Sequence, residues 1–335
     1  MATIKDVARL AGVGVGTASR VISGRGSASP AAVERVQGAV AQLGFRPSSL
    51  ARALSSRTLG MIGVFVPDFS GPFFGRILQT MDAELREFDR HMVAANGCGH
   101  GDRRQQALDG TAFLIQRECD GLMLQSNELL DEDLLALHRL QPRLAVLNRL
   151  VPTLEAQCFS ADHHVGGRLA AQALLSRGHR QIAVISGPNS APDNEARMAG
   201  FYEELTAHGI AREAVPQVEG DFSSESGWRA ASQLLERRVP FTGLFGANDV
   251  MAIAAISRLQ HAGLRVPEQV SVVGYDDSEP ASYSNPRLTC VRIPIQDVVS
   301  NASRYLLNEC YGSALPVTRI FEPTFVWRDS VAKVP

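Results

Sequence analysis

The sequence predicts an α/β fold in which a small three-helix headpiece precedes a larger α/β domain made of two lobes. Helical periodicity dominates residues 3–44, whereas short apolar runs alternate with helical segments from Leu59 onward. The alternating order is typical of a parallel sheet flanked by helices, and about 275 residues exceed what one core usually covers. Two lobes are therefore expected after the headpiece.

The first two helices of the headpiece are short and separated by a tight turn. Thr3 is a good N-cap, Asp6 stands three residues later as in a capping box, and Gly12 ends the first helix. The second helix starts near Gly14 and ends at Gly24. This layout is typical of a helix-turn-helix, whose second helix enters the major groove of DNA.

A third helix completes the headpiece. Ser29 is its expected N-cap, Pro30 occupies its first position, and an apolar stripe runs on to Gly44, which ends the helix. The three small helices are expected to share one core.

Gly12, Gly14 and Gly16 also resemble a dinucleotide-binding loop, but their context contradicts that interpretation. Such a loop follows a β-strand and is followed by an acidic residue about 20 positions later. Here a helical period precedes Gly12, and the acidic candidate, Glu34, lies on a predicted helix. No cofactor is expected.

The charge is divided unevenly along the chain. Residues 1–59 contain eight basic and two acidic residues, a net charge of +6, whereas the whole chain carries −2 and residues 60–335 therefore carry −8. A basic headpiece on an acidic body is the charge pattern of a module that binds phosphate groups of nucleic acid.

Four motifs, TIKDVARLAGV, TASRVISG, LGFRPSSLARAL and PDFSGPFF, resemble the LacI/GalR family of ligand-controlled transcriptional repressors over the full length of the chain. ATIKDVARLAGV, LNRLVP and EARMAGFYEEL are most similar to the galactose-repressor branch. The resemblance implies a helix-turn-helix headpiece at 1–46, a hinge helix and linker at 47–58, and a periplasmic-binding-protein-like effector and dimerisation domain at 59–335. It implies a first lobe at about 59–159 and 292–321, a second at about 160–291 and 322–335, and crossovers near Phe159, Val291 and Glu322.

The second helix departs from the family pattern at Gly14, Gly16 and Ala18, where the family usually has serine, alanine and valine. Glycine inside a helix costs about 0.8 to 1 kcal/mol, so Gly16 is expected to soften this helix. Val15 and Gly16 stand where the family touches base edges, and neither side chain can form a hydrogen bond, so thymine methyls, the backbone or neighbours such as Thr17 and Arg20 must read the bases.

The run after Pro47 can form a short helix, which is marginal in water when isolated. The resemblance implies that this is a hinge helix, with Leu54 wedged between base pairs from the minor groove and Ala51 and Ala53 close to the groove or partner. An ordinary linker helix is the alternative. The predicted DNA contacts are Thr3, Val15, Gly16, Thr17, Ser19, Arg20, Ser29, Ala51 and Leu54.

The body reads as two series of alternating strands and helices. The final segments at 295–308, 318–321 and 325–327 are expected to return to the lobes. The predicted strands are 61–66, 91–95, 121–124, 144–147, 181–186, 243–247 and 270–274, and the predicted helices are 73–88, 104–118, 134–140, 195–208, 225–237 and 251–261.

Ligands of open α/β sheets lie beyond the carboxyl ends of the strands, and polar or aromatic residues stand there in both series. The resemblance implies that Arg197, Asn248 and Asp276 grip the effector. Charged and amide groups suit sugar hydroxyls, and Phe73 and Phe222 suit the C–H face of a sugar. The predicted effector-binding residues are Phe73, Phe74, Gln125, Asn148, Arg149, Asp162, Arg197, Phe222, Asn248 and Asp276; Asp249 is expected to act only as an N-cap.

Other chemistry is weakly represented. The five cysteines show no CxxC spacing, and an odd count without an apolar targeting segment favours the reduced cytoplasm. His163 and His164 adjoin Asp162, but a structural or cleft role is favoured over a metal site. The motifs GxxxxGK, GxSxG and HExxH are missing, so neither an enzyme nor a metal centre is expected.

Three functions therefore remain open. The leading one is a homodimeric cytoplasmic repressor that binds near-palindromic operator DNA and a small effector, and no membrane association is expected. The expected effector is a monosaccharide or related sugar, and a purine or nucleoside is the alternative. No apolar heptad follows Trp327, which favours a dimer over a zipper-linked tetramer. A solute-binding protein would need a signal peptide and has no use for residues 1–58. An α/β enzyme would need a nucleophile or an acid–base pair in the cleft.

Overall fold

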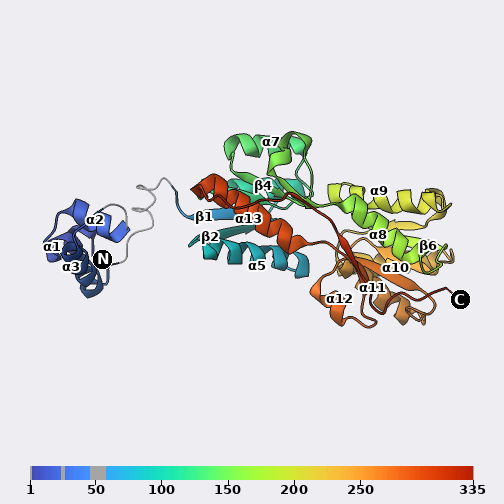
Figure 1. The fold of residues 1–335 in the computed structure, drawn as a ribbon. Helices are drawn as coiled ribbons and strands as arrows, with labels where there is room; N and C mark the ends of the chain where they lie inside the picture. Colours follow the sequence, from blue (N-terminus) through green and yellow to red (C-terminus); the bar gives the residue numbers. More distant parts are fainter. Residues whose placement is uncertain (1, 24–26, 46–57, 335) are drawn as a thin grey trace. The chain divides into compact units, whose positions relative to one another are not determined.

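The computed structural model describes residues 2–23, 27–45 and 58–334. The chain forms two compact units, Met1–Met61 and Ile62–Pro335, which are described separately (Figure 1). The predicted hinge segment, with Ala51, Ala53 and Leu54, lies outside the described residues.

The headpiece contains the three predicted helices, α1 (Ile4–Leu10), α2 (Val15–Ser23) and α3 (Pro30–Leu43). The capping box is confirmed, because Thr3 Oγ1 accepts from the Asp6 backbone N–H at 3.4 Å and the Asp6 carboxylate accepts from the Thr3 N–H at 2.9 Å. The Ser29 side chain caps α3, which ends at Gly44 in the left-handed conformation. Val7, Ala8, Ala11, Ala18, Val36 and Ala39 form one small core.

The first lobe is built on a six-stranded sheet in the order β11-β5-β4-β3-β1-β2, whose pairs β1–β3, β3–β4, β4–β5 and β5–β11 run parallel. Helices α5 and α13 cover one face, and α6 and α7 pack with the core of the other face (Figure 1). The strands are β1 (Met61–Val66), β2 (His91–Asn96), β3 (Gly121–Leu124), β4 (Leu144–Leu147), β5 (Cys158–Ala161) and β11 (Ile320–Phe321); the helices are α5 (Pro72–Glu87), α6 (Arg103–Gln116), α7 (Asp131–Leu140), α13 (Ile295–Tyr311) and a 3-10 helix at Pro152–Gln157.

The second lobe has a six-stranded sheet in the order β12-β10-β9-β8-β6-β7, parallel except for β12 against β10. Helices α8 and α9 cover one face and α10 and α11 the other. The strands are β6 (Ile182–Ser186), β7 (Gln217–Glu219), β8 (Gly243–Gly246), β9 (Ser271–Asp276), β10 (Thr289–Arg292) and β12 (Thr324–Val326); the helices are α8 (His163–Leu175), α9 (Pro192–Ala207), α10 (Ser224–Glu236), α11 (Asp249–His261), α12 (Glu279–Tyr283) and a 3-10 helix at Arg212–Ala214.

The chain passes between the two sheets three times: after β5, after β10, and between β11 and β12. The first passage lies beyond Ala161, because β5 pairs with β4 through Phe159 and with β11 through Ala161. One apolar cluster contains Phe159, Val291 and Ile293 and extends into both lobes. The lobes thus share a core at the crossings.

Helices α8 and α9 approach each other closely. A methyl group at Gly167 would overlap the Arg197 carbonyl oxygen, and one at Gly200 would overlap the His164 carbonyl oxygen. Glycine at these positions allows the two backbones to touch, which places Arg197 on α9 beside the first turn of α8. Among the described residues, no helix is both long and apolar enough to cross a membrane.

Candidate functional site

The headpiece presents one exposed face of α2. Val15, Gly16, Ser19 and Arg20 are exposed, whereas Ala18 is fully buried in the small core. Thr17 is partly buried, and its hydroxyl accepts from the Arg20 guanidinium at 3.4 Å. A helix with its small apolar side chain inward and these residues outward has the form of a recognition helix.

Thr3 and Ser29, also predicted to contact DNA, are exposed at the starts of α1 and α3. Each hydroxyl accepts a hydrogen bond from the backbone of its own helix.

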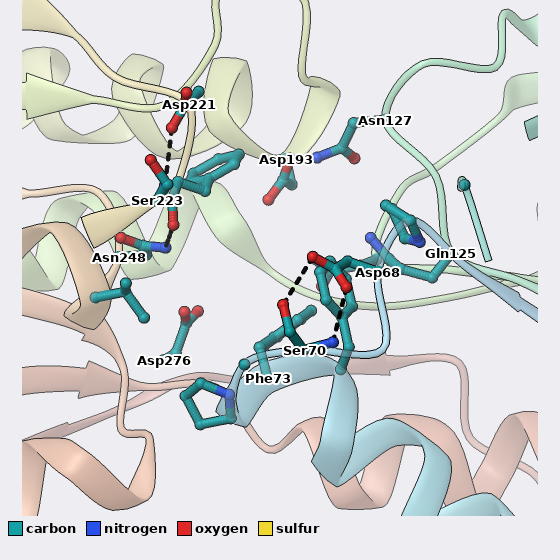
Figure 2. Close-up of a pocket in the computed structure, with 18 of the residues that line it drawn as sticks. Asp68, Ser70, Phe73, Gln125, Asn127, Asp193, Asp221, Ser223, Asn248 and Asp276 are labelled. Carbon is teal, nitrogen blue, oxygen red and sulfur yellow. Dashed lines mark hydrogen bonds between the residues drawn. The ribbon is translucent and has the colours of Figure 1, made fainter. Parts of the chain in front are cut away.

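The body contains a cavity of about 750 Å³ between its two lobes. The loops and helix starts after β1, β2, β3 and β4 line it from the first lobe, and those after β6, β7, β8 and β9 line it from the second. Figure 2 shows Asn248 and Asp276 facing Asp68, Phe73 and Gln125 across this cavity. The cavity therefore lies at the carboxyl ends of both sheets, where ligands of this fold class bind.

Arg197 is the most deeply buried cation of the cavity wall, at 1 % exposure. One guanidinium nitrogen donates to the Asp193 carboxylate at 3.0 Å, and another donates to the Ala247 carbonyl oxygen. The guanidinium carbon lies 3.8 Å from the centre of the Tyr275 ring. The Arg197 Nε and Asp193 Oδ1 atoms are buried without a hydrogen-bond partner, so one donor and one acceptor of this ion pair are unsatisfied in the described chain.

Asp276 stands at the end of β9, on the cavity wall. Its carboxylate makes no hydrogen bond or ion pair within the described chain, and its φ of 106° lies in a region that few side chains adopt. Burial raises the pKa of Asp276 well above its ordinary range, because the positive charge of Arg197 only partly offsets the loss of solvent. Hydrogen-bond donors of a ligand would stabilise the charged form of this partly buried carboxyl group.

Phe222 and Asn248 are tied to each other. The Asn248 side chain donates to the Phe222 carbonyl oxygen at 3.0 Å and caps α11 by accepting from the Met251 N–H at 2.9 Å. Phe222 adopts a left-handed backbone (φ 67°), and its ring fills the space next to Gly187 that a larger residue would need. The ring is thereby presented to the cavity with its position fixed.

Two more predicted residues supply amide groups. Gln125 is buried and its Oε1 has no hydrogen-bond partner, while Asn148 is buried with its Oδ1 2.8 Å from His163 Nε2. Together with Phe73 and Phe74, whose rings meet edge to face, they form the first lobe's wall of the cavity.

The structure brings most of the predicted effector-binding residues together and leaves two aside. Arg149 donates to the Leu129 carbonyl oxygen at 2.6 Å and to Asp131, within the first lobe, and Asp162 caps α8; neither lines the cavity. The predicted residues that do line it are Phe73, Phe74, Gln125, Asn148, Arg197, Phe222, Asn248 and Asp276.

The expectation that Asp249 is only an N-cap is wrong. Asn248 occupies the cap, and Asp249, fully buried in the first turn, accepts from the Ser278 N–H at 2.7 Å and from its hydroxyl at 3.0 Å. Burial raises the pKa of Asp249 to about 7. Asp249 therefore holds the loop that follows Asp276.

Several lining residues were missed by sequence reasoning. Asp68 and Ser70 follow β1 directly, within the PDFSGPFF motif, and bond each other at 2.7 and 2.8 Å. Asp193 lies one helical turn before Arg197, a spacing that could have signalled their ion pair. The missed polar residues are Asp68, Ser70, Cys98, Arg103, Gln106, Asn127, Glu128, Asp193, Asp221, Ser223, Ser224 and Ser278.

The two histidines considered for a metal site both have protein partners. His163 is buried between Asn148 and Tyr275, and His164 pairs with Glu203 at 2.9 Å. No group of three or more histidine, cysteine or carboxylate residues in the described ranges could hold a metal ion.

A helix-turn-helix unit followed by a two-lobed α/β unit with a ligand-sized cavity defines the class of one-chain bacterial regulators that combine a DNA-binding headpiece with a small-molecule domain. Residues 3–48 match the model for bacterial regulatory proteins of the lacI family, and residues 171–331 match that for a periplasmic binding protein-like domain. The chain belongs to the LacI family.

Three comparisons span nearly the whole chain. The HTH-type transcriptional regulator GalR of Escherichia coli (strain K12) is 35 % identical over 333 residues, covering 99 % of this chain and 96 % of the relative. The lac repressor dimer bound to operator and the anti-inducer ONPF has a TM-score of 0.86 at 27 % identity, covering 99 % of both chains. The complex of the transcriptional regulator CelR with cellobiose has a TM-score of 0.70 at 32 % identity, covering 98 % of this chain and 100 % of the other. These relatives are transcription regulators.

Proposed function

We propose that this protein is a homodimeric transcriptional repressor whose affinity for operator DNA is controlled by a neutral sugar bound between the two lobes. The family, the exposed face of α2 and the net charge of +6 in residues 1–59 support the DNA-binding part. The lac repressor is a dimer on its operator and CelR binds cellobiose, which supports the partners assigned here. As a transcriptional repressor, the protein would act in the cytoplasm and catalyse no reaction.

The observation that carries the sugar assignment is the polarity of the cavity wall. Asp276 lines the cavity without a hydrogen-bond partner in the described chain, and Asp68, Asp221, Gln125 and Asn127 add further acceptor groups to the lining, so a ligand with several donors suits this wall. Hydroxyl groups supply such donors, and the rings of Phe73 and Phe222 suit the apolar face of a sugar. We assign effector contacts to Phe73, Phe74, Gln125, Asn148, Asp193, Arg197, Phe222, Asn248 and Asp276.

The charge of the wall argues for a neutral ligand. Both lining arginines are already paired, Arg103 with Glu128 at 3.7 Å and Arg197 with Asp193 at 3.0 Å. The lining also contains Asp68 and Asp221, whose carboxylates accept hydrogen bonds from the backbone N–H groups of Ser70 and Ser223. A phosphorylated or acidic sugar would meet carboxylates without an unpaired cation in the described wall, which makes its binding unfavourable.

Isothermal calorimetry tests this assignment. The panel contains glucose, galactose, arabinose, ribose, maltose and cellobiose, with glucose 6-phosphate, adenine and adenosine as alternatives. We expect binding of at least one neutral sugar and none of the phosphate. Tight binding of adenine or adenosine alone would replace the sugar by a purine, and tight binding of the phosphate would refute the charge argument.

The headpiece contacts need a separate experiment. We assign DNA contacts to Thr3, Val15, Gly16, Thr17, Ser19, Arg20, Ser29, Ala51 and Leu54. Binding to a near-palindromic site selected from random DNA should weaken in Arg20→Ala while sugar binding persists, because residue 20 lies in the separate headpiece unit. Unchanged DNA affinity would contradict the assignment of the α2 face.

A further inference from the structure

One imidazole bridges the two lobes beside the cavity. His163 is the first residue of α8, immediately after the chain leaves the first sheet, and is 4 % exposed. Its Nε2 lies 2.8 Å from Oδ1 of Asn148, which follows β4 of the first sheet. Its Nδ1 lies 2.9 Å from the hydroxyl of Tyr275, in β9 of the second sheet. A single side chain thus links cavity-facing elements of both lobes.

The proton positions in this chain of hydrogen bonds follow from its chemistry. Burial and the charge of Arg197 lower the pKa of His163 well below its ordinary value, so the ring is neutral and has one donor and one acceptor. Because Asn148 Oδ1 can only accept, Nε2 carries the hydrogen. Nδ1 then accepts, and the Tyr275 hydroxyl donates to it.

The hydrogen bond from His163 Nε2 to Asn148 Oδ1 determines which part of the Asn148 amide a ligand can use. Its Oδ1 is occupied by His163, whereas its amide NH₂ makes no hydrogen bond with the described chain. The backbone of Asn148 is also held, with φ at 61° and its N–H donating to the Phe159 carbonyl oxygen at 2.8 Å. With Oδ1 tied back, the NH₂ is the part of the side chain left for the cavity, which Asn148 lines.

We infer that His163 is a positioning residue for effector recognition: it holds the Asn148 amide with its NH₂ toward the cavity, so that the effector must present a hydrogen-bond acceptor at this point. The inference rests on the proposed function, since it concerns the same cavity. It adds a residue that does not itself line the cavity and gives the cavity wall a donor among its many acceptors.

Three substitutions separate this role from simple packing. In His163→Gln the side-chain amide nitrogen can take the place of Nε2 and still donate to Asn148, whereas in His163→Asn the shorter side chain reaches only the place of Nδ1. His163→Leu fills the space and donates nothing. We expect about a fivefold to tenfold loss of affinity for the best-binding sugar of the panel in His163→Asn and His163→Leu, and less than about twofold in His163→Gln.

A double-mutant cycle shows whether the effect passes through Asn148. On an Asn148→Gly background, where glycine adopts the positive φ of residue 148 without strain, His163→Leu should change the calorimetric affinity for the same sugar by less than about twofold, because the amide that His163 orients is gone. A full additional loss on this background, or equal losses in His163→Gln and His163→Asn, would overturn the inference. Since His163→Gln and His163→Asn are both polar and of similar bulk, a folding defect in His163→Leu does not remove the test.

Nitrogen NMR of the ligand-free protein tests the proton positions without any sugar. The ¹⁵N shifts of His163, assigned by their loss in His163→Gln, should be those of a neutral ring protonated at Nε2 at about pH 7.5. A ring protonated at Nδ1, or at both nitrogens, would overturn the inference. Failure of every sugar to bind would instead contradict the proposed function, while the NMR result still decides the state of His163.

Discussion

Asp276 and Asp277 are adjacent carboxylates with opposite surroundings, and exchanging each for asparagine separates ligand binding from stability. Asp276 lines the cavity without an ion pair in the described chain, whereas Asp277 pairs with Arg292 at 2.6 Å and with Arg328 at 2.5 Å. Asparagine is the suitable replacement, because both residues have positive φ, which asparagine tolerates better than alanine.

The expected magnitude for Asp276→Asn follows from its two free oxygen atoms. A hydrogen bond to a charged group contributes about 1.5 to 3 kcal/mol and a neutral one about 1 kcal/mol, so each bond loses about 1 kcal/mol. Two sugar hydroxyls that donate to Asp276 and stabilise its charged form therefore predict a loss of up to about 2 kcal/mol, or up to about 30-fold in Kd, because the raised pKa of Asp276 offsets part of the gain. The free energy of unfolding should not fall, because no hydrogen bond of the ligand-free protein is removed.

The assay combines calorimetry with the panel sugar that binds the wild type and urea denaturation of both variants. Asp277→Asn should lower the free energy of unfolding by about 3 kcal/mol, because it leaves the largely buried Arg328 without its charged partner. Normal sugar affinity in Asp276→Asn, or a loss of stability as large as that of Asp277→Asn, would refute the assignment of Asp276 to ligand recognition.

Four further variants test other parts of the account. Gly16→Ala should raise the headpiece's free energy of unfolding by up to about 1 kcal/mol in a thermal melt, because alanine favours the helix, Gly16 lies in its first turn and a methyl group there meets no atom within 4 Å; a lower melting temperature would contradict this. Leu54→Ala should weaken operator binding by about 2 kcal/mol in a fluorescence titration and leave sugar affinity unchanged. Unchanged operator affinity would show that the minor-groove assignment of Leu54 is wrong. Arg197→Ala should weaken sugar binding in calorimetry at least about tenfold. It should also lower the melting temperature, because Asp193 is left buried and unpaired. Normal sugar affinity in this variant would show that Arg197 does not contact the sugar. In urea denaturation, Asp249→Asn should become more stable relative to the wild type as the pH rises from about 4 to about 7. The raised pKa of Asp249 makes the folded wild type hold a proton that its unfolded chain has already released, so the wild type loses stability over this range. Parallel pH profiles of the two proteins would show that the pKa of Asp249 is not raised.

Local patterns were sufficient to predict the headpiece and most strands. The strands Met61–Val66, Gly121–Leu124 and Leu144–Leu147 have the predicted limits, since each is a short apolar run buried within a sheet. The segment between the lobes was harder to predict. Strand β5 is only four residues long, and the buried face of α8 consists largely of glycine and alanine, which give a weak hydrophobic signal.

Site residues that directly follow a strand could be predicted from the sequence. Residues whose side-chain position depends on contacts with distant parts of the chain were predicted less well. Position after a strand correctly placed Gln125, Asn148 and Asp276 at the cavity. The same rule also selected Arg149, which turns into its own lobe because the Leu129 carbonyl oxygen and Asp131 are there to accept its donors. The role of His163 depends on two partners 15 and 112 residues away, which sequence spacing cannot reveal.

The most direct test of the central claim is a fluorescence-anisotropy titration of the full chain with its selected near-palindromic DNA, with and without a saturating panel sugar. We expect the sugar to change the DNA affinity by about fivefold or more. The DNA affinity should also fall steeply with salt, with log K decreasing by about 0.9 per phosphate neutralised for each tenfold rise in salt. A sugar that binds in the cavity and leaves the DNA affinity unchanged would contradict the claim that the two units are coupled.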